Sequence, residues 1–284
     1  MWRWRPSILL FIKVFVWIVS GLVLFGCQSA PPSELCGQPT TRLETELTDV
    51  DYDRLDDAPF SNRLREAMVL SYFEICPQRR TQPLPGRRTS NIICRVDGTS
   101  DRTIVVGAHF DKLGPGKGIA DNWSGIVLMI RLLGQVTSQS NQLSWEFIAF
   151  ADEEQGMLGS RHYVSTTNLK HVVAMLNVDT MGMAVNRIDK RSDPNLRCEA
   201  YAVANSANIQ LRDVLLRETT GDWAPFQMAG IPVLNLMSLD KYQLRKVHSR
   251  DDRRRAVKDH WLNESWQLLA NLQRHLDEKL HQTD

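Results

Sequence analysis

Short, almost wholly apolar runs that end in histidine or acidic residues are the feature that most limits how this chain can fold. The run at 103–108 reads TIVVGA and is followed by His109, and the run at 145–151 is followed by Asp152. Strands that are apolar at successive positions are buried on both faces, as in parallel sheets covered by helices. Because helical patterns separate the runs, we expect a three-layer α/β/α sandwich with a central mixed, mostly parallel sheet.

The expected strands are residues 103–108, 145–151, 173–178, 200–204 and 231–236, and the expected helices are residues 124–136, 159–166, 208–217 and 257–280. Ahead of them, apolar residues at helical spacing, Leu64, Ala67, Met68 and Tyr72, predict a helix from Ser61. A strand near Ile75, a turn at 83–86 and a strand at 90–96 predict a hairpin. In such sheets the chemistry collects beyond the carboxyl ends of the strands.

Side chains that can bind metal ions stand at five separate strand or helix ends: His109, Asp121, Glu154, Asp179 and His248. Each has a simpler interpretation when taken alone, and Asp121, for example, suits a helix N-cap. Together, two imidazoles and three carboxylates suit zinc better than calcium, which prefers oxygen ligands throughout. If one carboxylate is shared, each of two ions receives three protein ligands and keeps an open position, as catalytic zinc does.

Two further acids are placed to assist such a centre. Glu153 precedes Glu154, so one carboxylate of the pair can bind metal while the other takes a proton from the attacking water. Asp111 follows His109 by two residues, where it can orient the imidazole ring. The glycine-rich segment 113–118 lacks the P-loop order of glycines before Lys and Ser or Thr, so it does not predict a phosphate site.

The ordered segments GAHFD, IADNWSG, FADEEQGMLGS, NVDTMG, GDWAPFQMAGIP and VHSRDD resemble the co-catalytic zinc aminopeptidases of the bacterial leucyl aminopeptidase type, over about residues 60–275. The resemblance implies one Zn²⁺ held by His109, Asp121 and Asp179, and a second held by Asp121, Glu154 and His248. It implies that Glu153 is the general base and that Asp111 orients His109. It also implies a cis peptide bond between Asp121 and Asn122.

The function that the resemblance implies is hydrolysis of the N-terminal peptide bond of peptides with a free N-terminus, using two Zn²⁺ per chain. Glutaminyl cyclases share this fold and use a single zinc, and they are the alternative. The complete set of five ligands favours the peptidase over the cyclase, and also over a receptor ectodomain that has lost its ligands.

The substrate pocket is less clearly marked in the sequence. Trp123, Met157, Met181 and Phe226 are candidates for an apolar pocket that receives the first side chain, with core packing as the alternative role. Asp222 is a further candidate, although relatives often have Asp-His where this chain has Asp222-Trp223. Relatives can also use a Tyr for the oxyanion; here Tyr242 could serve only if its loop folds inward.

The N-terminal segment predicts export. Arg3 and Arg5 precede an apolar run at 8–25 that ends in Gly26 and Cys27. This pattern resembles a bacterial lipoprotein processing site, with residues 1–26 as signal peptide and Cys27 lipidated. An uncleaved transmembrane anchor is the alternative, because ~18–20 apolar residues can span a bilayer.

Either kind of anchor would place the protein in the bacterial cell envelope, facing the periplasm or exterior. The expected zinc peptidase domain is residues 61–284, and residues 27–60 are expected to form a tether and an irregular segment.

The chain has 34 Lys+Arg against 33 Asp+Glu. Since nucleic-acid-binding proteins usually carry a clearly basic surface, no nucleic-acid partner is expected.

Four cysteines remain once Cys27 is assigned to the lipid: Cys36, Cys76, Cys94 and Cys198. In an exported protein an even number predicts two disulfides, with buried free thiols as the alternative. The turn at 83–86 lies midway between Cys76 and Cys94, so hairpin strands would bring these two opposite each other. That pairing leaves Cys36 with Cys198, and a Cys36–Cys76 bond is the rival.

Overall fold

The computed structural model describes residues 36, 38–39, 43–44 and 47–282. Its centre is an eight-stranded mixed sheet in the order β1-β2-β4-β3-β5-β8-β6-β7. The strands are β1 (Gln78–Pro83), β2 (Ser90–Val96), β3 (Thr103–His109), β4 (Ser144–Phe150), β5 (Val172–Val178), β6 (Asn186–Asp189), β7 (Leu211–Val214) and β8 (Val233–Met237). The central strands β4, β3, β5 and β8 are mutually parallel.

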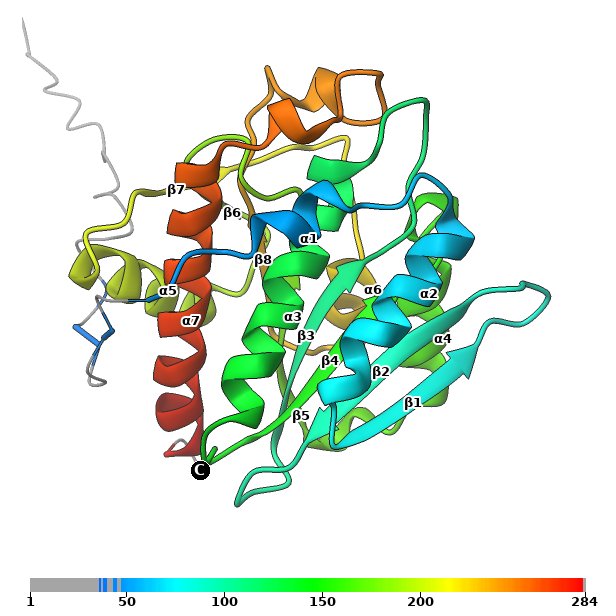
Figure 1. Ribbon diagram of the computed structural model, residues 1–284. Coiled ribbons are helices and arrows are strands. Elements are labelled where there is room, and N and C mark those ends of the chain that lie inside the picture. Colours follow the sequence, from blue (N-terminus) through cyan, green and yellow to red (C-terminus); the bar gives the residue numbers. More distant parts are fainter. Residues whose placement is uncertain (1–35, 37, 40–42, 45–46, 283–284) are drawn as a thin grey trace, which may run out of the picture.

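Helices cover both faces of this sheet. They are α1 (Tyr52–Asp56), α2 (Asn62–Tyr72), α3 (Ser124–Thr137), α4 (Leu158–Thr166), α5 (Pro194–Ser206), α6 (Trp223–Met228) and α7 (Asp259–His281). α3 and α7 lie side by side over one face, and α4 and α6 lie together behind the other (Figure 1). Every residue of β3 and β4 is buried. The predicted three-layer sandwich and its buried central strands are confirmed.

Two elements between β5 and β8 differ from their predictions. Residues 200–204, expected as a strand, belong to α5, because Asp193 caps that helix by accepting N–H bonds from Asn195 and Leu196. Residues 208–217, expected as a helix, contain the short strand β7, which pairs with β6 in parallel. Pairing with a distant strand decides the conformation of such a short segment more than its local pattern does.

Helix α2 is present, but it buries a different face from the one predicted. Leu64 is 59% exposed, whereas Arg65 and Val69 are fully buried. The Arg65 guanidinium lies over the Trp123 ring, with its carbon 5.1 Å from the ring centroid. A buried arginine cannot be recognised from apolar spacing, so the predicted face was wrong.

The predicted Cys76–Cys94 disulfide is present, although the register that suggested it is wrong. Ile75 lies in a 3₁₀ turn and is 52% exposed, and β1 begins only at Gln78. In the β1–β2 pair the residue opposite Cys94 is Arg79. Cys76 therefore reaches Cys94 from the segment before the strand, with Cα atoms 5.7 Å apart.

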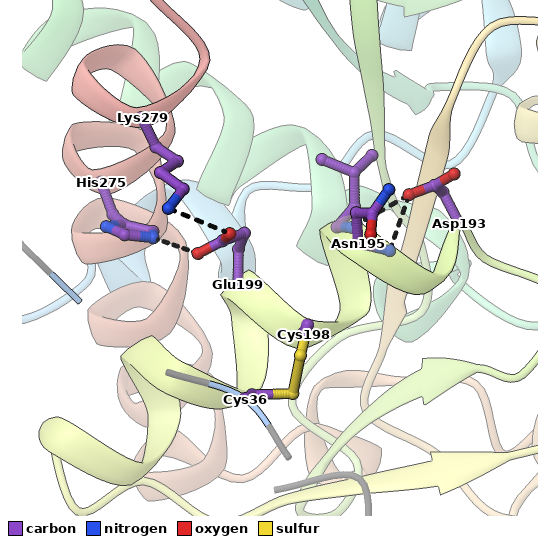
Figure 2. Close-up of a disulfide and its surroundings, with 8 residues drawn as sticks. Cys36, Asp193, Asn195, Cys198, Glu199, His275 and Lys279 are labelled. Atoms are coloured by element: carbon purple, nitrogen blue, oxygen red, sulfur yellow. Dashed lines mark hydrogen bonds and ion pairs between the residues drawn. A yellow bond between two sulfur atoms is a disulfide. The ribbon is translucent and has the colours of Figure 1, made fainter. Parts of the chain in front are cut away.

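The second predicted disulfide joins Cys36 to Cys198 of α5, across 162 residues of sequence (Figure 2). The N-terminal segment then continues over α7, where Asn271 accepts the Glu44 N–H and donates its own N–H to the Glu44 carbonyl. Val50 and Leu55 are buried in the main core. The described residues before 60 thus pack as part of the domain and include a helix, α1.

Within the described ranges, no helix is both long and apolar enough to cross a membrane. The predicted signal segment and Cys27 lie outside the described residues.

Candidate metal centre

The carboxyl ends of the central strands bring two of the predicted ligands together with Asp121. His109 ends β3 and Asp179 directly follows β5, which is the neighbour of β3 in the sheet. His109 Nε2 lies 3.0 Å from Asp121 Oδ1 and 3.6 Å from Asp179 Oδ1. The imidazole is 2% exposed, so these three groups meet in the interior.

The other two candidates meet Asp121 from its opposite side. His248 Nε2 lies 3.0 Å from Asp121 Oδ2 and 2.8 Å from Glu154 Oε2. The two oxygens of the Asp121 carboxylate therefore face different imidazoles, with a second carboxylate beside each. All five candidates gather in one cluster, in two groups that share Asp121.

The cluster has the ligand atoms that a cation site needs, and one of its buried oxygens has no hydrogen-bond partner among the described residues. His109, Asp121 and Glu154 each offer a ligand atom, and these atoms lie within 4.8 Å of one another. Glu154 Oε1 is buried and has no hydrogen-bond partner among the described residues. An unpaired buried carboxylate oxygen is costly, and a bound cation would satisfy it. Imidazole and carboxylate donors in this mixture fit zinc.

Crowded negative charge dominates the electrostatics of the cluster. Hydrogen bonds that Asp121 and Glu154 accept from His248 raise the pKa of this imidazole to about 10. Burial lowers the pKa of His109, but hydrogen bonds with Asp111, Asp121 and Asp179 outweigh it and the pKa is raised well above its usual value. Burial, with neighbouring carboxylates, raises the pKa of Glu153 to about 9. The cluster thus stabilises positive charge, whether it is carried by protons or by metal ions.

Asp111 has a wider role than the one predicted from its spacing. Its carboxylate accepts the backbone N–H bonds of Glu153 (3.0 Å) and Glu154 (3.1 Å). It also lies 3.6 Å from His109 Nδ1, which is nearer, at 3.2 Å, to the backbone carbonyl of Asp111. Asp111 therefore positions the turn that carries both glutamates as well as the imidazole.

The backbone around Asp121 is held by the side chains of Asp252 and Asn122, and the sequence did not predict this role for either residue. Asp252 accepts the N–H bonds of Ala120 (2.7 Å) and Asp121 (3.2 Å). Asn122 donates to the Val178 carbonyl (2.9 Å), so it ties the backbone next to Asp121 to the end of β5. The predicted cis peptide bond between Asp121 and Asn122 is present. The only sequence signal for these two residues is their place inside the segments IADNWSG and VHSRDD.

The glycine-rich segment 113–118 packs tightly against the loop that carries His248. A Cβ atom on Gly114 would lie 2.1 Å from the His248 carbonyl oxygen, and one on Gly116 would lie 2.3 Å from that of Ser249. Both distances are far inside van der Waals contact. These glycines are therefore required for close backbone packing, which brings His248 within reach of Asp121.

A cavity of about 310 Å³ opens over the ligand cluster. His109, Asp121, Glu153, Glu154, Asp179 and His248 lie at the cluster, and the remaining wall is formed by Gly156, Met157, Thr180, Leu216, Glu218, Thr219, Thr220, Trp223, Asn235, Met237, Leu239, Leu244 and Val247. Much of that wall is apolar. The cavity can therefore accept an apolar side chain next to the cluster.

Most of the residues predicted to bind substrate lie elsewhere. Of the apolar candidates, Met157 lines the cavity, whereas Trp123, Met181 and Phe226 are buried and are absent from its wall. Asp222 is also buried outside the wall, directly before Trp223. Burial raises the pKa of Asp222 to about 7. Trp223, which was not among the residues predicted to bind substrate, does line the cavity wall.

Tyr242 does not fold inward over the cluster. Its side chain is 65% exposed, and it is absent from the cavity wall.

Known proteins share both the sequence pattern and the fold. A family model described as Peptidase family M28 matches residues 91–274. Aminopeptidase YwaD of Bacillus subtilis is 29% identical over 143 residues, which cover 47% of this chain and 31% of that protein. The probable lipoprotein aminopeptidase LpqL of Mycobacterium tuberculosis is 28% identical over 175 residues, covering 53% and 35%. The chain thus spans about a third of the length of these curated relatives.

Solved structures agree on the fold. BSAP, a zinc aminopeptidase from Bacillus subtilis, has a TM-score of 0.59 at 23% identity, over 65% of this chain and 49% of that one. LapB of Legionella pneumophila has a TM-score of 0.68 at 17% identity, over 80% and 70%. An Acidobacteriales bacterium glutaminyl cyclase has a TM-score of 0.65 at 18% identity, over 84% and 99%. Since the family model spans most of the sheet and all five clustered ligand candidates, the chain belongs to peptidase family M28.

Proposed function

We propose that this chain is a zinc aminopeptidase that removes N-terminal residues from peptides by means of two metal ions. The observation that carries the proposal is the position of Asp121. Its two carboxylate oxygens each lie 3.0 Å from a different imidazole, His109 or His248. One carboxylate between two histidines is the arrangement expected of a ligand that bridges two ions.

The ligand sets follow from the two sides of Asp121. His109, Asp121 and Asp179 would hold one zinc ion, and Asp121, Glu154 and His248 would hold the other. When bound, zinc supplies a Lewis acid that polarises the scissile carbonyl group and lowers the pKa of water.

The remaining chemistry is proton transfer by Glu153. Its side chain lines the cavity, and its backbone is fixed by the bond from its N–H to Asp111. From there Glu153 would accept the proton of the attacking water and return it to the leaving amine. The concentration of carboxylates would attract the positively charged N-terminus of a peptide, and the apolar wall would receive its first side chain. The aminopeptidase names of several family relatives support this reading.

Glutaminyl cyclisation with a single zinc is the second candidate. One observation favours it: the Acidobacteriales bacterium cyclase is matched over 99% of its length, whereas BSAP is matched over 49%. The two-sided cluster around Asp121 favours the peptidase, because a single ion needs only one of its sides.

We also propose that the chain is anchored in a bacterial membrane through a lipid on Cys27. The support is the sequence of residues 1–27 and the name of LpqL, a probable lipoprotein aminopeptidase. Mass spectrometry of the mature N-terminus tests this: a chain that retains residues 1–26 would contradict it.

One experiment separates the two activities. Protein purified without residues 1–27 is analysed for metal content and incubated with amino-acid amides and with peptides that begin with Gln or Leu. The aminopeptidase should contain two zinc ions per chain and release free Leu. A single zinc ion with pyroglutamate formation from the Gln peptides would identify a cyclase instead.

A further inference from the structure

One wall of the cavity is a loop without regular structure. Residues 215–222 connect β7 to α6, and Leu216, Glu218, Thr219 and Thr220 of this loop line the cavity together with Trp223. No strand or helix ladder holds the loop. The shape of this wall therefore depends on the side chains that bind the loop from behind.

Arg191 binds the loop from outside the cavity. Its Nη1 donates to the Thr219 carbonyl (2.9 Å), and its Nη2 donates to the Leu216 carbonyl (3.2 Å). Its guanidinium carbon lies 4.7 Å from the centroid of the Trp223 ring. A single side chain thus contacts three residues of the wall, although Arg191 does not itself line the cavity.

Arg191 is itself held rigidly. Asp189, which is fully buried at the end of β6, accepts Nε at 2.9 Å and Nη2 at 2.5 Å in a two-point ion pair. The Arg191 backbone N–H donates to the same carboxylate (2.8 Å), and the Arg191 carbonyl accepts from Gln227 of α6 (2.7 Å). Two residues further on, Asp193 caps α5 (Figure 2). Bidentate charge-assisted bonds of this kind fix direction as well as distance.

We propose that Arg191 is a positioning residue that sets the shape of the apolar wall and thereby the preference for large first side chains. This inference rests on the proposed aminopeptidase function. Without Arg191, the Thr219 carbonyl loses the Arg191 donor, the Leu216 carbonyl keeps only the bonds from Thr219 within the loop, and Trp223 loses the cation that covers one side of its ring. The loop at 215–222 would then be held less firmly and the apolar wall would lose its shape. The ligand cluster is held by other elements and would remain intact.

The test compares the full-length protein with its Arg191→Met variant, which keeps an unbranched apolar stem but cannot donate. For Leu and Phe amides, KM should rise about tenfold, the lower end of the range for altered apolar pockets, while kcat changes less than about twofold. For Ala amide, KM should change by less than about twofold, because a methyl group needs little of the wall. The ratio of Leu to Ala kcat/KM should therefore fall.

Arg274→Met is the matched control. Arg274 also forms an ion pair, with Glu44 (2.7 Å), but it lies on α7 and is absent from the cavity and from the loop. Arg191→Lys, which keeps the charge without the planar fork, should give an intermediate selectivity. Trp223→Ala should reproduce the loss, and combining it with Arg191→Met should add little, since both act on one wall.

A second readout does not depend on activity. Arg217 is exposed in the same loop, so limited trypsin digestion reports how firmly the loop is held. Cleavage after Arg217 should be several times faster in Arg191→Met than in the wild type or in Arg274→Met.

The outcomes are distinct. An unchanged Leu-to-Ala ratio with unchanged cleavage after Arg217 would overturn the inference, as would an equal loss for all substrates that Arg274→Met also shows. If the wild type cleaves no amide at all, the proposed function fails. The trypsin rates and the Arg191→Lys variant then decide alone whether Arg191 holds the loop.

Discussion

Asp121 is the residue on which the proposed metal centre depends, and its surroundings leave it little freedom. Its N–H is bound by Asp252, and the next residue, Asn122, is bound to the end of β5. A carboxylate held from both sides of the backbone keeps one oxygen toward His109 and the other toward His248.

Replacing Asp121 should affect both ions, whereas replacing His248 should affect one. Asp121→Asn loses a charged ligand that both groups share, so the occupancy of both sites should fall. His248→Ala should chiefly empty the site that it shares with Glu154. Metal analysis after dialysis against a weak chelator measures the occupancies. If Asp121→Asn still holds two ions with unchanged affinity, Asp121 does not bridge them.

Glu153→Gln should abolish turnover without changing metal content. The amide keeps the shape of the side chain and leaves the backbone bond to Asp111 in place, but it cannot accept a proton. The loss of a general base typically costs ~10²–10⁴-fold in rate. Glu74→Gln, at an exposed position far from the cluster in sequence, serves as the control. A Glu153→Gln enzyme with more than half of the wild-type activity would refute the assignment.

At the scale of elements, α2 is joined by one buried arginine to the loops that carry the proposed metal ligands. Arg65 donates to four backbone carbonyls: those of Pro59, Phe110, Lys117 and Gly118. Phe110 directly follows the proposed ligand His109, and Gly118 starts the turn that leads to Asp121. Burial lowers the pKa of Arg65 to about 10, so the side chain stays charged at neutral pH and balances the nearby carboxylates.

Arg65→Met should destabilise the protein strongly. A buried carbonyl left without a donor costs ~1–3 kcal/mol. The Gly118 carbonyl keeps the Trp123 N–H, but the other three lose the Arg65 donor, so we expect a total loss of about 3 kcal/mol or more. Urea unfolding measures the change. Arg63→Met, at an exposed position of the same helix, should alter the free energy of unfolding by less than about 0.5 kcal/mol. An equal effect of both substitutions would show that the carbonyl contacts contribute nothing specific.

At the scale of the whole molecule, the N-terminal segment is joined to the domain at several points. The Cys36–Cys198 bond attaches it to α5. On α7, Asn271 forms hydrogen bonds with both the N–H and the carbonyl of Glu44, and Asn263 accepts the Val50 N–H. These contacts connect parts of the chain more than 160 residues apart. Of these contacts, the Cys36–Cys198 bond persists on unfolding, so it limits the freedom of the unfolded chain over the 162 residues that it spans.

The two disulfides should differ in their effect on stability. In the chain-entropy account, a cross-link stabilises more as the loop that it closes lengthens, by about 3 kcal/mol for short loops and ~5 kcal/mol for the longest. The Cys36–Cys198 separation is 162 residues, and the Cys76–Cys94 separation is 18. Cys36→Ser/Cys198→Ser should therefore lower the free energy of unfolding more than Cys76→Ser/Cys94→Ser. Equal losses in urea titrations would mean that local packing, not loop length, sets the stabilisation.

The sequence by itself determined the parts of this protein whose signals are local. An apolar strand and the charged residue that ends it are neighbours in the chain, so the buried strands β3 and β4 and the convergence of His109 and Asp179 could be predicted. The correct cysteine pairs were predicted as well, although the register behind them was not, because β1 begins after Cys76.

Only the tertiary structure decided the parts that depend on distant contacts. The cavity wall is a loop without periodicity, and the arginine that binds its carbonyls lies 25 and 28 residues earlier in the chain. Arg65 is buried because four carbonyls from other segments surround it, which no hydrophobic pattern can reveal. Periodicity reports whether a residue faces an apolar interior, whereas a buried polar side chain depends on partners that folding alone brings within reach.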